Sequence, residues 1–319
     1  MQETTKGSIN TKAGTKSIFK KKKMRRTIQC YAMIATQLIG LLVFTLYPML
    51  WAVNKAFYFY TGVPSETTFS GLENFKNVFT DATYWRTWVT TIEFALIKLA
   101  IELPISMFLA VILNKKLMGR GIFRAIFYLP NIISVAIVGL VFSNMFDFFG
   151  FMNALLIKLG LISEEIYWFG SFKTAMIALI IGSVWMGFGT NMMFFLAALQ
   201  NIDKEIYESA YLDGASSPTV FFKITLPLVA PAVQTIVLLG INGTLHVNEY
   251  ILVSSNGAPG GQTLSVLAYQ VSKFVPGFMD SAVKTNLGYG CAMSIITSII
   301  MCIIALTYNK LTQKANSIY

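Results

Sequence analysis

Hydrophobic residues dominate six long stretches of this 319-residue chain, and shorter polar segments separate them. A helix crosses a bilayer with about 20 consecutive, mostly apolar residues, and each stretch is long enough to do so. The pattern therefore predicts an all-α polytopic membrane protein with six transmembrane helices. We expect the spans at residues 30–53, 86–113, 122–146, 173–199, 228–253 and 287–309.

The polar segment between the fourth and fifth spans, residues 201–231, has a helical pattern of its own. Asp203 and Glu205 are acidic residues of the kind that favour the first turn of a helix. Gly214 suits the left-handed conformation that ends a helix, and Ser217 and Pro218 are typical of an N-cap and a first helical residue. We therefore predict two short helices joined by a turn, folded into a compact unit between two spans.

Positive charge is placed unevenly along the chain, whose net charge is +10. Residues 1–29 hold nine Lys and Arg residues against one Glu, and residues 114–124 hold four basic residues and no acid. Because basic loops stay on the cytoplasmic side, we predict that both termini and the 201–227 loop are cytoplasmic. We expect a disordered, solvated tail that can touch anionic membrane lipids; a nucleic-acid partner is not needed to explain it.

The composition gives little support for an enzyme or a metalloprotein. The chain has one His and three Cys residues without CxxC spacing, too few ligands for a metal site. It lacks a phosphate-binding loop and a plausible nucleophile and general base. We therefore expect no catalytic residue, no metal and no cofactor bound by this chain, and two regions: the tail at residues 1–29 and a membrane domain at residues 30–319.

A set of residues in the 201–231 segment resembles the EAA motif of ABC-importer membrane subunits, in which EAA, DGA, F, I and LP recur at fixed spacings. The matching residues are Glu208, Ser209, Ala210, Asp213, Gly214, Ala215, Phe221, Ile224, Leu226 and Pro227. Ser209 replaces the first alanine, and Pro218 stands where the family often has a bulky residue. In that family this loop is the coupling helix, which sits in a cleft of the ATPase subunit.

Other segments resemble the carbohydrate-uptake branch of this family, with its maltose-transporter-type membrane subunit. They are the GLENF segment at 71–75, residues 117–130, residues 150–156, and the NGAP turn at 256–259 with Thr263. The resemblance runs from about residue 30 to the end of the chain. It implies a type I ABC importer permease fold with a cytoplasmic coupling helix at 201–227.

The resemblance also implies a function and a set of partners. The chain is expected to be the multi-pass permease of an ATP-driven importer in the bacterial cell membrane, for an oligosaccharide or related sugar. A separate ATPase subunit would bind ATP and Mg, a sister permease would complete a heterodimer, and an extracellular binding lipoprotein would deliver the solute. Glu208 would make a charged contact with the ATPase, and Ala210, Gly214 and Ala215 would allow close approach.

Small and polar residues in the third, fourth and fifth spans are candidates for the solute path. Such residues permit close helix packing or open a helix toward a cavity, and by resemblance these spans line the sugar cavity. The candidates are Asn131, Ser134, Ser183, Gly187, Asn191, Gly240, Asn242, Gly243, Thr244, Asn248 and Glu249.

The charged residues inside the spans leave alternatives open. Lys98 and Glu102 stand four residues apart in the second span, where they form a structural pair or line the path. Together with Glu249 they would also suit an ion-coupled carrier or a channel. Solute uptake that does not depend on ATP would distinguish such a protein from an ABC permease. An ABC permease for another solute is a further alternative. Whether His246 or these charges contact the solute, and which sugar is carried, is left open.

Overall fold

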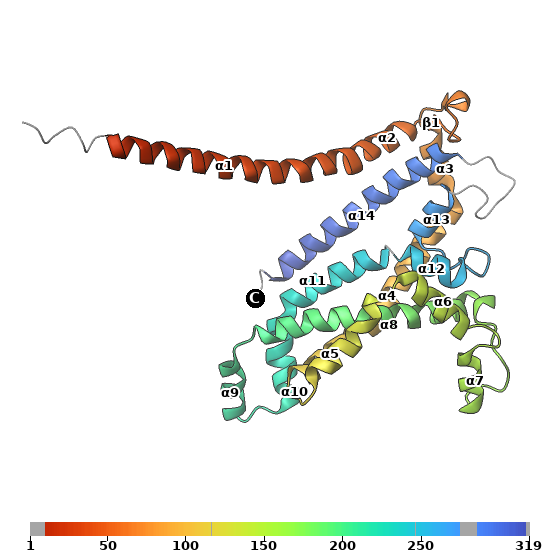
Figure 1. Cartoon of the computed structure of the whole chain (residues 1–319). Coiled ribbons are helices and arrows are strands. Elements are labelled where there is room, and N and C mark those ends of the chain that lie inside the picture. Colours follow the sequence, from red (N-terminus) through yellow and green to blue (C-terminus); the bar gives the residue numbers. More distant parts are fainter. Residues whose placement is uncertain (1–9, 116, 246, 275–285, 317–319) are drawn as a thin grey trace, which may run out of the picture.

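The computed structural model describes residues 10–115, 117–245, 247–274 and 286–316 (Figure 1). It is helical apart from one short two-stranded hairpin, so the all-α prediction is confirmed. Within these residues five helices are long and apolar enough to cross a membrane, and a bent helix pair is a sixth candidate. The five are Thr27–Lys55, Ala82–Asn114, Phe172–Gln200, Ser217–Thr244 and Leu287–Thr312.

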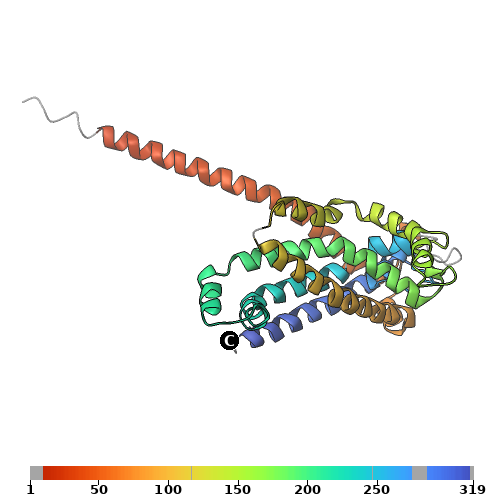
Figure 2. The ribbon, with the colours of Figure 1, turned by 90° about the horizontal axis from the view of Figure 1, so that it is seen from below.

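The first span forms a rod that extends away from the other helices (Figures 1 and 2). It consists of α1 (Asn10–Leu41), a π-helical segment η1 (Leu42–Leu46) and α2 (Tyr47–Lys55). The expectation of a disordered tail is wrong from Asn10 onward, because the helix begins there; residues 1–9 lie outside the described part. Lys and Arg are good helix formers, and extending an existing helix needs no new nucleus.

The loop after the first span is fastened by a buried asparagine. Strands β1 (Tyr58–Phe59) and β2 (Thr68–Phe69) pair antiparallel around the short helix η2 (Pro64–Glu66), and α3 (Glu73–Thr80) follows. Asn74, within the GLENF segment, donates through Nδ2 to the carbonyls of Ala56 and Tyr58, both at 2.9 Å. Its Oδ1 accepts from Nδ2 of Asn286, also at 2.9 Å. The motif residue thereby joins this loop to the start of the last span.

Helix α4 (Ala82–Asn114) is the central element of the bundle. It packs most extensively on α8 (Phe172–Gln200) and also contacts α11 (Leu226–Leu245) and α13 (Val266–Ser272). The Tyr84 hydroxyl lies 3.0 Å from Oγ1 of Thr297 on α14 (Leu287–Asn316). The fourth, fifth and sixth predicted spans therefore all contact the second, α4.

Asp81 caps the start of α4 and joins it to two other helices. Its side chain accepts from the N–H groups of Thr83 and Tyr84 and from the hydroxyls of Tyr269 and Tyr289. Burial raises the pKa of the Asp81 carboxyl, but the hydrogen bonds, foremost that from Tyr289, together bring this pKa below its ordinary value. The carboxylate is therefore held in its charged form.

The predicted third span, residues 122–146, is wrong as a single helix. It divides into α5 (Arg120–Tyr128), the 3-10 turn η3 (Leu129–Ile132) and α6 (Val135–Met145), with a 91° bend between Arg120–Ile132 and Val135–Met145. Pro130 removes a backbone donor at the break, and Ile133 has the extended backbone angles φ −72° and ψ 139°. All three parts of this element contact α8.

A second motif asparagine fastens the loop after α6. Helix α7 (Phe151–Lys158) carries Asn153, whose Nδ2 donates to the carbonyls of Phe148 and Ile166, both at 2.8 Å. The indole Nε1 of Trp168, in the 3-10 turn η4 (Trp168–Gly170), donates to Oδ1 of Asn153 at 2.9 Å. Asn153 of the 150–156 segment thus holds together the loop in which it lies.

The predicted fifth span, residues 228–253, has different limits in the structure. Helix α10 (Ser217–Val220), the π-helical segment η5 (Phe221–Thr225) and α11 form one uninterrupted helix, which ends at Leu245. The last residues of the predicted span belong to a separate helix, α12 (Asn248–Ser255), which packs on α6. The second short helix expected after Gly214 is therefore the beginning of a span.

We predict that Asn74→Ala destabilises the protein, because two backbone carbonyls and the Asn286 amide lose their partner. Leaving a buried polar group unsatisfied costs about 1–3 kcal/mol, so the apparent Tm of the purified protein in detergent should fall by several degrees. Asn77→Ala, on the exposed side of the same helix, is the control. Equal Tm values for the two variants would contradict the assigned role.

Candidate functional site

The coupling loop begins with α9 (Lys204–Leu212), which ends in a Schellman turn. The Gly214 N–H donates to the carbonyl of Tyr211 at 3.1 Å, and the Ala215 N–H donates to that of Ala210 at 3.0 Å. This pair of bonds defines the Schellman motif and needs a left-handed residue between them. Gly214 has φ +79°, so its predicted role as a helix terminator is confirmed.

The motif residues of α9 differ in their exposure. Glu208 and Ser209 are exposed, whereas Ala210 is only 8% exposed and lies against the chain itself. A Cβ added to Gly214 would have nothing within 4 Å. The exposed residues at this turn therefore include Glu208, Ser209, Leu212, Asp213 and Gly214, whereas Ala210 is packed against the chain.

The other motif residues lie on the continuous helix after the turn. The N-cap of α10 is Ser216, one residue earlier than the Ser217 predicted, so that Pro218 is the second helical residue. Phe221 packs against the buried hydrophobic cluster that includes Leu199 and Val229, and Ile224 is half-buried. The Thr225 hydroxyl lies 3.3 Å from that of Tyr207 and connects this helix to α9.

The π-helical segment η5 ends two residues before Pro227. The Leu226 N–H donates to the carbonyl of Phe221, five residues back, which widens the helix by one residue per turn. Pro227 has no N–H to continue the ladder. The helix therefore passes the motif proline without breaking, and the coupling segment joins the span directly.

The intramembrane charges of the second span form a buried pair. Lys98 Nζ lies 3.3 Å from Glu102 Oε2, and Asn191 Nδ2 donates to Glu102 Oε1 at 2.6 Å. A Cβ at Gly187 would overlap this carboxylate. The predicted pairing of Lys98 and Glu102 is confirmed, and Gly187 and Asn191 pack around the Glu102 carboxylate at the contact of α4 and α8.

The solute-path candidates divide into buried and exposed groups. Ser183, Asn191 and Thr244 are buried within this chain, and Gly240 lies against Leu99. The exposed or half-buried candidates on α11, α12 and the third span form the second group. They are Asn131, Ser134, Asn242, Gly243, Asn248 and Glu249.

Two observations refine this second group. Asn131 and Thr190 are hydrogen-bonded through Nδ2 and Oγ1, at 2.5 Å, so η3 is held against α8. Asn248 and Glu249 were predicted at the outer end of the fifth span and instead begin α12. His246, between α11 and α12, lies outside the described residues.

Residues 102–316, about two thirds of the chain, match the family model described as "Binding-protein-dependent transport system inner membrane component". The chain belongs to this family. It is therefore the permease subunit of an ABC transporter, and the ATPase is a separate subunit. The stand-alone carrier and channel alternatives are wrong for that reason.

Individual relatives extend the similarity over most of the chain. It is 34% identical over 284 residues to the probable ABC transporter permease protein YesP of Bacillus subtilis, covering 88% of this chain and 89% of that protein. It is 33% identical over 246 residues to the lactose transport system permease protein LacF of Rhizobium radiobacter, covering 75% and 82%.

A solved structure shares the fold. A chain of a bacterial ABC transporter involved in the import of the acidic polysaccharide alginate superposes with a TM-score of 0.77 at 23% identity, covering 92% of this permease and 98% of that chain. The predicted permease fold is confirmed by this match.

We predict that Gly189→Ala destabilises the permease, because a Cβ there would overlap the backbone carbonyl of Phe127 and push α5 away from α8. Overpacking of this kind costs about 1–3 kcal/mol. Gly243→Ala is the matched control: nothing lies within 4 Å of the added Cβ, and Ala favours a helix by about 0.5–1 kcal/mol over Gly. Thermal unfolding in detergent should separate them; a Gly189→Ala protein as stable as the control would refute the contact.

Proposed function

We propose that this permease forms part of the translocation path for a carbohydrate in an ATP-driven importer. The observation that carries the proposal is the folded α9–Gly214–α10 unit, which presents the EAA-type residues at one end of the bundle and continues into the fifth span. The permease has no ATP-binding motif of its own. The energy of ATP hydrolysis must therefore reach it through a contact between the separate ATPase subunit and a surface such as this unit.

The exposed side of the turn is the proposed ATPase contact. Glu208 is exposed and unpaired among the described ion pairs, and a charged contact that becomes desolvated in an interface contributes more than a surface pair. Gly214 leaves open space beside it for a close approach. Asp213, Ala215 and the buried motif residues would act by holding this surface in shape.

The carbohydrate assignment rests on the motif segments and on one relative. Asn74 and Asn153 hold together the loops that contain the 71–75 and 150–156 segments, at the opposite end of the bundle from the coupling unit (Figure 1). LacF, with its lactose transport name, covers three quarters of the chain. Amide and carboxylate groups of the exposed path candidates can hydrogen-bond sugar hydroxyls.

The partners and orientation follow from the same reasoning. We infer a sister permease that covers the unburied faces of this chain, an ATPase at the coupling unit, and an extracellular binding lipoprotein at the end built by the 54–82 and 147–172 loops. Arg120 and Arg124 of the basic 114–124 segment lie beside the coupling helix, and the basic residues near the N-terminus favour the same side; this supports both termini on the cytoplasmic side of a bacterial cell membrane.

We predict that copurification from native membranes recovers an ATPase and a second six-span subunit with the wild-type chain. Gly214→Asp should lose most of the ATPase, because the left-handed backbone disfavours a side chain and the new carboxylate lies on the contact surface. Glu208→Ala should weaken recovery less. Gly160→Asp, in a left-handed position of the opposite loop, should leave recovery unchanged. A wild-type chain that purifies alone would contradict the coupling assignment.

We further predict that the binding protein recovered in this experiment carries a carbohydrate. Mass spectrometry of its bound solute would identify the sugar and its length. An amino acid or inorganic phosphate in that site would overturn the carbohydrate assignment and leave the coupling assignment intact.

A further inference from the structure

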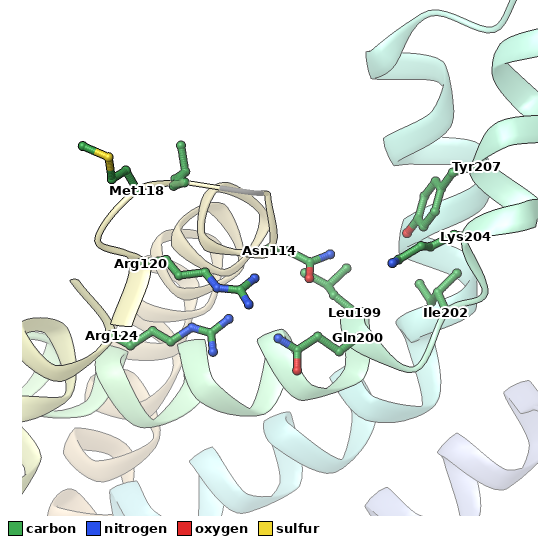
Figure 3. A pocket seen from close by; sticks show the side chains of 10 residues that line it. Asn114, Met118, Arg120, Arg124, Leu199, Gln200, Ile202, Lys204 and Tyr207 are labelled. Carbon is green, nitrogen blue, oxygen red and sulfur yellow. The ribbon is translucent and has the colours of Figure 1, made fainter. Parts of the chain in front are cut away.

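A polar cavity of about 920 Å³ opens at the coupling end of the bundle, beside α9 (Figure 3). Arg120 and Arg124 reach into it from α5, and Lys204 and Tyr207 approach from the opposite wall. The remaining lining residues are Asn114, Leu117, Met118, Leu199, Gln200 and Ile202. Arg120, Arg124 and Lys204 belong neither to the EAA-type residues nor to the candidates for the solute path.

The described residues that line this cavity carry basic side chains without an acidic one among them. The three cations are Arg120, Arg124 and Lys204. Arg124 donates to the carbonyl of Leu113 at 3.5 Å through Nη2, but its Nε is buried with no hydrogen-bond partner. Like charges brought together without an anion repel one another, so the arrangement favours a bound anion.

The geometry of the donors suits a phosphate group. Arg120 and Arg124 stand one helical turn apart and extend in the same direction in Figure 3, which allows two guanidinium groups to grip one tetrahedral anion. The Asn114 and Gln200 amides lie between the arginines and Lys204 and can donate to further oxygens. The volume lies in the range of small-molecule sites.

One rim of the cavity is apolar. Met118, which lines the cavity, is 99% exposed, and Ile122 and Ile126 on α5 are more than half exposed. A short helix with basic residues on one side and exposed apolar residues on the other is typical of a membrane interface. Acyl chains could therefore follow α5 while a headgroup phosphate enters the cavity.

We propose that the cavity between α5 and α9 binds a phosphate group, carried by the headgroup of an anionic phospholipid or by a soluble phosphorylated compound. Basic pockets beside spans bind anionic headgroups in this manner. Because Lys204 and Tyr207 belong to the coupling helix, the ligand links that helix to the loop before the third span. The inference needs the basic cavity alone and does not depend on which solute is transported.

The test uses the full chain in nanodiscs and compares two double variants. Arg120→Gln with Lys204→Gln removes two exposed cations of the cavity and keeps Arg124, which also bonds the backbone. Lys115→Gln with Lys223→Gln removes two exposed cations from the same segments, outside the cavity lining. Native mass spectrometry measures retained phosphatidylglycerol against phosphatidylcholine, and calorimetry measures glycerol 3-phosphate.

We expect the wild type and the control to retain phosphatidylglycerol and not phosphatidylcholine. The cavity variant should bind it about 30-fold more weakly, since each basic residue near a headgroup contributes about a fivefold gain. Binding of glycerol 3-phosphate with the same variant dependence, without lipid retention, would identify a soluble ligand.

Two outcomes would overturn the proposal. One is phosphate binding that is equal in the two double variants. The other is a wild type that binds neither phosphate probe, together with a cavity variant that loses the copurified ATPase. This result would identify the cavity as a contact with the ATPase. A comparison of thermal unfolding between the variants excludes a folding defect as the cause.

Discussion

The buried contact of Lys98, Glu102 and Asn191 is the interaction on which this bundle depends. Removing charges from water is costly, and taking away one partner of a buried pair costs about 3–5 kcal/mol because the other charge is left uncompensated. Here the carboxylate is held by an ammonium on its own helix and an amide on α8. The register between α4 and α8 is thereby fixed, and α5, α6, α11 and α12 pack on one or both of these helices, whereas the first span packs on α14.

The two ends of the bundle are stabilised by different means. At one end, the amides of Asn74 and Asn153 bind backbone carbonyls of loops that have little regular structure. At the other end, the coupling unit is closed by backbone hydrogen bonds at Gly214 and by the Tyr207–Thr225 contact. Motif residues at both ends thus serve first to shape the surfaces that partners would recognise.

Local features of this permease were predictable from sequence, and long-range ones were not. The apolar runs and the glycine at 214 depend on short-range properties: five of the six predicted spans contain one long apolar helix, and Gly214 ends α9 as predicted. The bend at Pro130 and the end of the fifth span at Leu245 depend on packing between α6, α8 and α12, which hydropathy does not reveal. Likewise Asn74 and Asn286, 212 positions apart, and the cations around the cavity meet only in the folded chain. The ATPase and solute contacts predicted for individual residues stay predictions.

The π-helical segment before Pro227 sets the angular phase between the coupling unit and the fifth span. Successive residues of an α-helix are about 100° apart around its axis, and the wide turn of Phe221–Thr225 accommodates an additional residue. The faces of α10 are therefore rotated by about that angle from where a regular helix would place them. Because the helix is continuous from Ser217 to Leu245, a push of a partner on the proposed coupling unit would turn α11 about its axis as well as displace it along that axis.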